Sequence, residues 1–141
     1  GLFYITDDLD ARTGSLNVNG HLQRVLIRDD IFGPRDEQAD ITTDSLGDLS
    51  VLGRMRNARV DVDGRAERVF VNRELLNSRI EAEELGRVQV NGSITSDSLA
   101  PDDVVHASDE DSSFYLFYRG RRWHVDEDNP VTENGYKFYV G

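Results

Sequence analysis

The sequence predicts an all-β fold, a parallel and right-handed β-solenoid of about four coils with an antiparallel aromatic cap at its C-terminal end. Three observations carry this prediction: short apolar alternations recur along the chain, the step between them is nearly constant, and aromatic residues cluster after residue 113. Alternation at period 2 is typical of a strand with one buried face. A recurrence every 20 residues or so indicates stacked repeats.

The repeated unit opens with a strand pattern that occurs four times. The anchors of the pattern are Leu16, Leu49, Val69 and Val88, separated by 33, 20 and 19 residues. We expect the last three of them to stack in one column of the core. The residues expected to point inward are Leu16, Val18, Leu49, Val51, Val69, Val71, Val88 and Val90.

Each unit continues through a polar corner into a second strand. Segments 49–62 and 69–82 align without gaps, and each has an asparagine at the corner, Asn57 or Asn77. Asparagine tolerates left-handed backbone angles better than most residues, so it suits a corner. We therefore expect a strand, a corner and a second strand in every repeat.

Two segments depart from this unit. In the first unit Arg24 takes the corner position, and the extra length is assigned to an inserted loop at 31–38, where Gly-Pro and clustered charge favour a loop. Residues 73–85 have a composition that also suits a helix. We expect strand there because the aligned segment 52–64 is poor helix sequence.

The C-terminal region has a different composition, with 9 of the 12 aromatic residues after residue 113. The expected strands are 114–118, 122–125 and 136–140. We expect residues 101–141 to form an aromatic cap on the repeat region of residues 1–100, within a single domain, because an open end of a solenoid would template aggregation. Residues 126–130 are expected to loop out, and residues 2–5 to close the first coil.

Over residues 14–96 the chain resembles the β-helix-type repeats of very large secreted bacterial surface proteins. Leu46-Gly47 and Leu85-Gly86 stand before the strand as in those repeats, whereas Ala66-Glu67 stands there in the third unit and Arg73 replaces the strand glycine. The resemblance implies a non-catalytic stalk or scaffold in an extracellular protein, of which this chain is a terminal piece.

The composition of the chain excludes several classes of partner and chemistry. The net charge of −11 argues against nucleic acid and anionic membranes, because both would be repelled. The chain has no cysteine, which excludes disulfides and thiol chemistry. No apolar run approaches the roughly 18 residues that span a bilayer. The chain opens Gly1-Leu2-Phe3 without Met, so we expect a processed chain or an excised fragment, from which any signal peptide has been lost. The resemblance to secreted surface proteins implies that the protein is secreted or lies at the cell surface.

No set of residues has the pattern of a catalytic site. We therefore expect a non-enzymatic structural or interaction module with protein or glycan partners, no cofactor, and self-association through the solenoid ends. A carbohydrate-binding module is one alternative, with sugars stacking on aromatic rings. Its candidate ligand-binding residues are Trp123, Tyr115, Tyr118 and Tyr136.

A small carbohydrate-active enzyme is the second alternative, with a charged solenoid face as its site. The outward residues concerned are Arg54, Arg56, Arg59, Arg73, Arg79, Glu74 and Glu81. Alternating Arg and Glu on stacked strands is more simply explained by cross-strand ion pairs, which is what we expect.

Clusters of acidic residues in the sequence are candidate calcium-binding sites. Asp126, Glu127 and Asp128 are the candidate Ca²⁺ ligands, since calcium prefers oxygen donors on turns. The spacing of the helix–loop–helix calcium motif and the glycine-rich nonapeptide are both missing. We therefore expect solvated turn acids, with calcium binding as the alternative. His21, His106 and His124 lie on different segments and are expected at the surface or in the cap.

Overall fold

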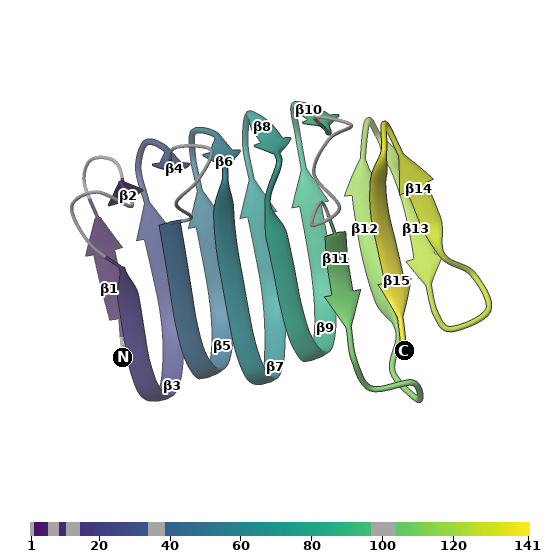
Figure 1. The fold of residues 1–141 in the computed structure, drawn as a ribbon, viewed down its shortest axis with the longest axis horizontal. Coiled ribbons are helices and arrows are strands. Elements are labelled where there is room, and N and C mark those ends of the chain that lie inside the picture. The colour runs from purple at the N-terminus through teal and green to yellow at the C-terminus, as the bar shows by residue number, and fades with distance from the viewer. Residues whose placement is uncertain (1, 6–8, 11–14, 34–38, 97–103) are drawn as a thin grey trace.

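A computed structural model describes residues 2–5, 9–10, 15–33, 39–96 and 104–141. All regular structure in these residues is β, with fifteen strands and no helix (Figure 1). Within these ranges there is consequently no helix of the length and apolarity needed to cross a membrane. The predicted all-β class is confirmed.

The strands form two sheets. The larger sheet contains β1 Leu2–Ile5, β3 Leu16–Ile27, β5 Ala39–Val51, β7 Ala58–Val71, β9 Arg79–Val90, β11 Val104–Ala107, β12 Phe114–Tyr118, β13 Arg121–Val125, β14 Val131–Glu133 and β15 Tyr136–Val140. The smaller sheet contains β2 Leu9–Asp10, β4 Ile31–Phe32, β6 Met55–Arg56, β8 Glu74–Leu76 and β10 Ser93–Thr95. Figure 1 shows the long strands side by side, with the short strands along the upper edge.

Successive long strands pair in parallel and in register. β5 pairs with β7 and β7 with β9, so Leu49, Val69 and Val88 are neighbours in one column, and all three are fully buried. The predicted column is therefore confirmed. Between one long strand and the next, the chain passes through a short strand that pairs with the short strands before and after it. This arrangement is compatible with the predicted β-solenoid.

Each long strand bends in its middle, so the two sheets enclose the core from three sides. Register shifts at residues 43–46 and 62–65 mark the bends. Before the bend, the column Ile41, Val60 and Ile80 points inward; after it, the column of Leu49 does so; the short strands add Ile31, Met55, Leu75 and Ile94. All of these residues belong to one apolar core, and burying each such side chain stabilises the fold by about 1.5–3 kcal/mol.

Asn57 and Asn77 form the corners between a short strand and the next long one. Their φ angles are 49° and 47°, in the left-handed region that asparagine tolerates. The Asn57 side-chain amide donates a hydrogen bond of 2.9 Å to the carbonyl of Gly33, which follows β4 as Asn57 follows β6. The predicted corners are confirmed, and residues 73–85 form strand rather than helix.

The first repeat has a different register from the predicted one. Leu16 pairs with Ile41, and it is Val25 that pairs with Leu49. Arg24 accordingly lies within β3, opposite Asp48, and not at a corner. The prediction was wrong because both halves of a long strand alternate at period 2, so the segment around Leu16 matches either half equally well. Of the predicted inward residues, Val18 is only partly buried and the others are buried.

The predicted insertion is also smaller than expected. Ile31 and Phe32 form β4, and Ile31 is fully buried. Residues 34–38 lie outside the described residues. The step from Val25 to Leu49 is 24 residues, against 20 for the step to Val69, so the extra length in this repeat is small.

The C-terminal strands extend the larger sheet. β11 pairs in parallel with the first half of β9, and β12 with its second half. A turn at 119–120 joins β12 to β13, and a turn at 134–135 joins β14 to β15. Each of these two strand pairs is antiparallel, and all four turn residues have positive φ. The three predicted aromatic segments are strands, but β12 and β15 also pair in parallel with β9 and β11. At the other end, β1 pairs in parallel with β3.

Candidate functional site

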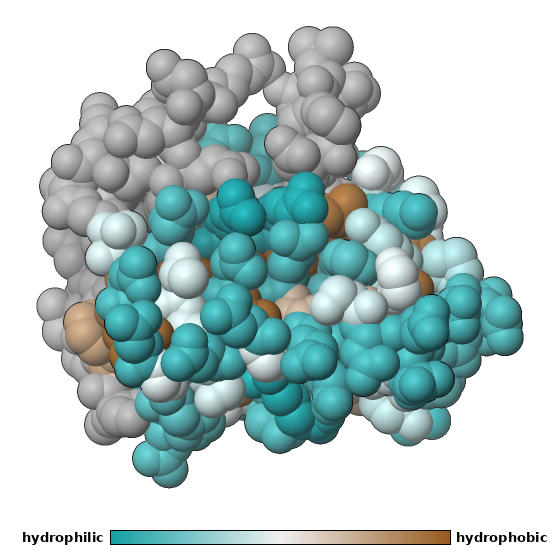
Figure 2. Space-filling view, turned by 60° about the horizontal axis from the view of Figure 1, so that its bottom comes forward, coloured by the Kyte–Doolittle hydropathy of each residue, from teal (hydrophilic) through white to brown (hydrophobic). Residues whose placement is uncertain are grey.

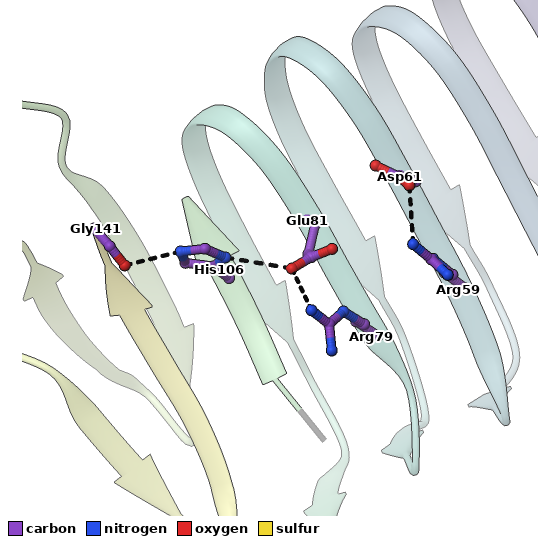
Figure 3. Close-up of polar contacts among 6 residues, drawn as sticks. All are labelled: Arg59, Asp61, Arg79, Glu81, His106 and Gly141. Carbon is purple, nitrogen blue, oxygen red and sulfur yellow. Dashed lines mark hydrogen bonds and ion pairs between the residues drawn. The ribbon is translucent and has the colours of Figure 1, made fainter. Parts of the chain in front are cut away.

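One group of polar side chains projects outward before the bends of the long strands. Arg79 donates to the Glu81 carboxylate at 2.6 Å, and His106 on β11 lies 3.3 Å from the same Glu81 oxygen (Figure 3). The other ring nitrogen of His106 is 3.0 Å from the carbonyl of Gly141, and the ring stacks on Tyr139 with centroids 4.3 Å apart. We call Arg79, Glu81, His106 and Tyr139 the histidine cluster.

On this outward face of β7 and β9, an arginine is paired with a carboxylate of its own strand. The hydrogen bond from Arg79, with a smaller contribution from His106, lowers the pKa of Glu81 below its ordinary range. On the preceding strand, Arg59 and Asp61 form the same pair at 3.2 Å. The register places Arg59 opposite Arg79, so like charges face each other across strands, where they would repel. An opposite charge two residues away in each strand offsets this repulsion.

The ion pairs differ partly from the predicted cross-strand pattern. Arg68 with Asp48 and Arg65 with Glu84 do join different strands, but Arg79–Glu81 and Arg59–Asp61 lie within a single strand. The other members of the predicted charged face are Arg54, Arg56, Arg73 and Glu74, which belong to the short strands and their turns. The predicted residues therefore lie on different sides of the fold and do not line one groove.

The bends of the long strands are rich in carboxylates. Arg65 joins two of them, at 2.6 Å from Glu67 and 2.7 Å from Glu84, and its hydrogen bond lowers the pKa of Glu67. Figure 2 turns this lower edge of the molecule toward the viewer and shows a mostly hydrophilic surface with small, separated hydrophobic areas. Nearby, Asp61, Glu81 and His106 contribute to the lining of a shallow depression of about 210 Å³.

The acidic residues do not form a metal centre in the part of the chain that the structure describes. No group of three or more His, Asp or Glu side chains there could hold a metal ion. Asp126 instead accepts hydrogen bonds from the Asp128 N–H at 3.1 Å and the Asn129 amide at 2.7 Å, and lies 3.5 Å from His124. Asp128 and Glu127 are exposed. These contacts organise the loop after β13.

The four aromatic residues predicted to bind ligands lie in two different environments. Tyr136 is fully buried, and its hydroxyl is hydrogen-bonded to the backbone of Ser78. Tyr118 is 2% exposed. Both rings belong to the core: Tyr136 is enclosed in it, and Tyr118 lies at its edge, beneath Arg119. Tyr115, at 42% exposure, and the partly buried Trp123 remain at the surface.

Arginines gather beside these surface rings, at the tip of the β12–β13 hairpin and on β9. Each guanidinium lies over an aromatic ring: Arg87 over Phe117 at 4.3 Å, Arg119 over Tyr118 at 5.2 Å, Arg121 over Trp123 at 4.9 Å and Arg122 over Tyr115 at 5.3 Å. The strand register places Arg87, Arg122, Tyr115 and Phe117 on one face of the hairpin and Arg121, Tyr118 and Trp123 on the other, and Arg119 lies in the turn at the tip between them. We call these four arginines and four rings, which surround the tip of the hairpin, the arginine–aromatic surface. It borders a depression of about 340 Å³ that Gln89 and Asn91 also line.

Sequence reasoning missed the arginines of this surface. The available signal was the run Arg119-Gly120-Arg121-Arg122, three cations at a turn between two aromatic strands in an acidic chain. Arg87 could not be added from the sequence, because only the parallel pairing of β12 with β9 brings it to Phe117.

No family model, no curated protein and no solved structure matches this chain. A proposal for its function therefore rests on the sequence and the structure of the chain itself.

Proposed function

We propose that the chain is a non-catalytic structural and interaction module of a secreted or cell-surface bacterial protein. The observation that carries the proposal is that outward carboxylates of the long strands are paired with neighbouring cations. Glu81 is held by Arg79 and His106, and Glu67 by Arg65. A general acid or base needs a titratable group free to meet a substrate. These carboxylates instead stabilise the repetitive surface.

The proposal includes a right-handed β-solenoid with one long and one short strand per coil, in keeping with the rule for parallel crossovers. Its cap would be the two C-terminal hairpins. Support comes from Phe114, Tyr136 and Phe138, which are buried at this end of the core. The outer strands also suit an exposed edge: β14 has three residues and follows Pro130, and β13 carries adjacent exposed arginines.

Labelling of intact cells tests the proposed location. An antibody raised against residues 1–141 should bind intact producing cells, or the protein should be recovered from the medium. A cytoplasmic protein labelled only after permeabilisation serves as the control. Antibody binding that requires permeabilisation would place the protein inside the cell and contradict this part of the proposal.

Turnover assays test the non-catalytic role. We expect no release of products from neutral or acidic polysaccharides incubated with the purified chain. The alternative of a carbohydrate-active enzyme predicts turnover of a uronic-acid polymer that Glu81→Gln abolishes. Glu74→Gln, on the short strand β8, is the matched control for a carboxylate on another side of the fold.

A further inference from the structure

The arginine–aromatic surface differs in charge from the rest of this acidic chain. Arg59, Arg65, Arg68 and Arg79 each pair with a carboxylate. By contrast, no carboxylate of the described residues forms an ion pair with Arg87, Arg119, Arg121 or Arg122. Arg119, Arg121 and Arg122 line one depression, so their charges repel one another and create a local positive potential in a protein of net charge −11. An anion bound among them would relieve this repulsion.

The aromatic rings hold these guanidinium groups in place. A guanidinium stacked on a ring is attracted through its flat face, which leaves its N–H edge available to bind an oxyanion in its plane. The distances of 4.3 Å for Arg87 and 4.9 Å for Arg121 are within the range of such contacts. Because the side chains are ordered before a ligand arrives, less entropy is lost on binding.

The depression beside the arginines also offers neutral hydrogen-bonding groups. The Gln89 amide donates to the Asn91 side-chain oxygen at 3.0 Å, and the Asn91 amide donates to Asn72 at 3.2 Å. This chain of amides fixes the orientation of Gln89 and leaves its carbonyl oxygen as an acceptor for a hydroxyl group. The volume of about 340 Å³ is at the small end of the range for small-ligand sites.

We propose that the arginine–aromatic surface binds an acidic saccharide, whose carboxylate or sulfate group is held by the arginines and whose hydroxyls meet Gln89. Bidentate binding of oxyanions is the characteristic chemistry of arginine. A sugar supplies, in one small unit, the oxyanion, the hydroxyls and a C–H face that packs on Phe117, which is partly exposed.

Other anionic partners fit this surface less well. Nucleic acid or an anionic bilayer would extend beyond the four arginines and meet the carboxylates that give the chain its net charge of −11. An acidic peptide would gain affinity by adding a strand to a sheet edge. Beside the depression that edge is the outer one of β13, because β9 is already paired on both sides and β12 lies between β9 and β13. A peptide paired there would be separated from Gln89 on β9 by two strands, and hexaglutamate is the probe that tests it.

Binding of defined oligosaccharides to the full chain tests the proposal. Trp123 is the only tryptophan and lies under Arg121, so its fluorescence reports on the surface directly. We expect tetragalacturonate or a sulfated tetrasaccharide to change this fluorescence saturably, and a neutral tetrasaccharide to have no effect. Of the two acidic probes, the one that binds more tightly identifies the oxyanion. Raising the salt concentration should weaken binding, since the contacts are ionic.

Two double variants that remove the same charge locate the site. Arg121→Gln/Arg122→Gln should weaken acidic-saccharide binding at least tenfold, whereas Arg54→Gln/Arg73→Gln, from the turns beside the short strands, should leave it unchanged. Because Arg121→Gln also alters the surroundings of Trp123, the affinities of all variants are measured by calorimetry. Amide chemical shifts in the wild-type chain give a readout that needs no substitution: Gln89 and Asn91 should move on titration.

Three results would overturn the proposal. The first is an absence of acidic-saccharide binding at millimolar concentration. The second is an equal loss of affinity in the two double variants, or chemical-shift changes away from Gln89 and Asn91. The third is equal binding of hexaglutamate or inorganic sulfate, which would indicate a general anion site without a role for the sugar.

Discussion

Tyr136 is hydrogen-bonded twice to the backbone of Ser78, which lies 58 residues earlier in the sequence. The phenol donates to the Ser78 carbonyl at 2.8 Å and accepts from the Ser78 N–H. Both residues are fully buried. Ser78 follows the left-handed Asn77 corner, where its backbone groups are turned away from the regular strand ladder. The last strand of the chain thus stabilises a corner in the middle of the repeats.

Removal of this hydroxyl should destabilise the fold. Tyr136→Phe would leave a buried N–H and a buried C=O without partners, which costs about 2–4 kcal/mol of unfolding free energy. Urea denaturation followed by circular dichroism measures the loss. Tyr139→Phe is the matched control, because this ring lies at the surface against His106, and we expect it to change stability by less than about 0.5 kcal/mol. Equal stabilities of the two variants would contradict the role assigned to the pair.

The corner at Asn57 separates a backbone effect from a side-chain effect. Asn57→Gly keeps the φ of 49° accessible and loses the hydrogen bond to Gly33, which should cost about 1 kcal/mol. Asn57→Ala loses the bond and adds the strain of a left-handed alanine, for a total of about 2 kcal/mol or more. The denaturation midpoints of the wild-type chain and the two variants give both the contribution of the hydrogen bond and the cost of the left-handed alanine. An alanine variant as stable as the glycine variant would show that the left-handed angle is not maintained.

Gly92 should not tolerate a side chain, because the repeats approach closely there. A Cβ atom at this position would lie 1.5 Å from the carbonyl oxygen of Arg73. Gly92→Ala must therefore displace backbone in the turns before β10 or β8, and we expect a loss of more than about 2 kcal/mol of unfolding free energy, measured by denaturant unfolding. The control is Arg73→Ala, at the equivalent position of the preceding repeat, where an exposed side chain is removed at a cost below about 0.5 kcal/mol.

The Arg79–Glu81 pair should make stability depend on pH. Because the pKa of Glu81 is lowered in the folded protein, its stabilising contribution is present above the ordinary value of 4.5 and is lost as the pH falls through the lowered value. Arg79→Gln should raise the pKa of Glu81 and make the fall in unfolding free energy below pH 4.5 less steep. A ¹³C NMR titration of the Glu81 carboxyl group measures the shift directly.

The control for this titration is Arg59→Gln, one strand away, which should move the pKa of Glu81 far less than Arg79→Gln does. An unchanged Glu81 titration in Arg79→Gln would show that the 2.6 Å contact is not populated in solution.

Truncation after Pro101 tests the proposed cap. The shortened chain would lack β11 and β12, so β9 would present a long unpaired edge together with the apolar side chains of Ile80 and Val88. We expect an insoluble or oligomeric product by size-exclusion chromatography, because such an edge recruits other strands. A truncated protein that stays monomeric and melts like the full chain would falsify the capping role.

Local signals in the sequence were sufficient for the strands and the corners. Val69 and Val71 alternate with polar residues, and Asn57 and Asn77 recur at the same place in aligned segments. These features depend on a few neighbouring residues and on intrinsic backbone preferences, which are independent of the rest of the fold. The repeat step then predicted correctly that Leu49, Val69 and Val88 share a column.

The tertiary structure decided the relationships between residues far apart in the chain. Leu16 fits either half of a long strand by its alternation, and only pairing with β5 places it beside Ile41. Likewise, an aromatic strand has no sequence mark that separates a buried Tyr136 from an exposed Tyr115. The reason is physical: an alternating strand has two faces and two edges, and the segments packed against it, 20 to 58 residues away here, determine which of them are buried.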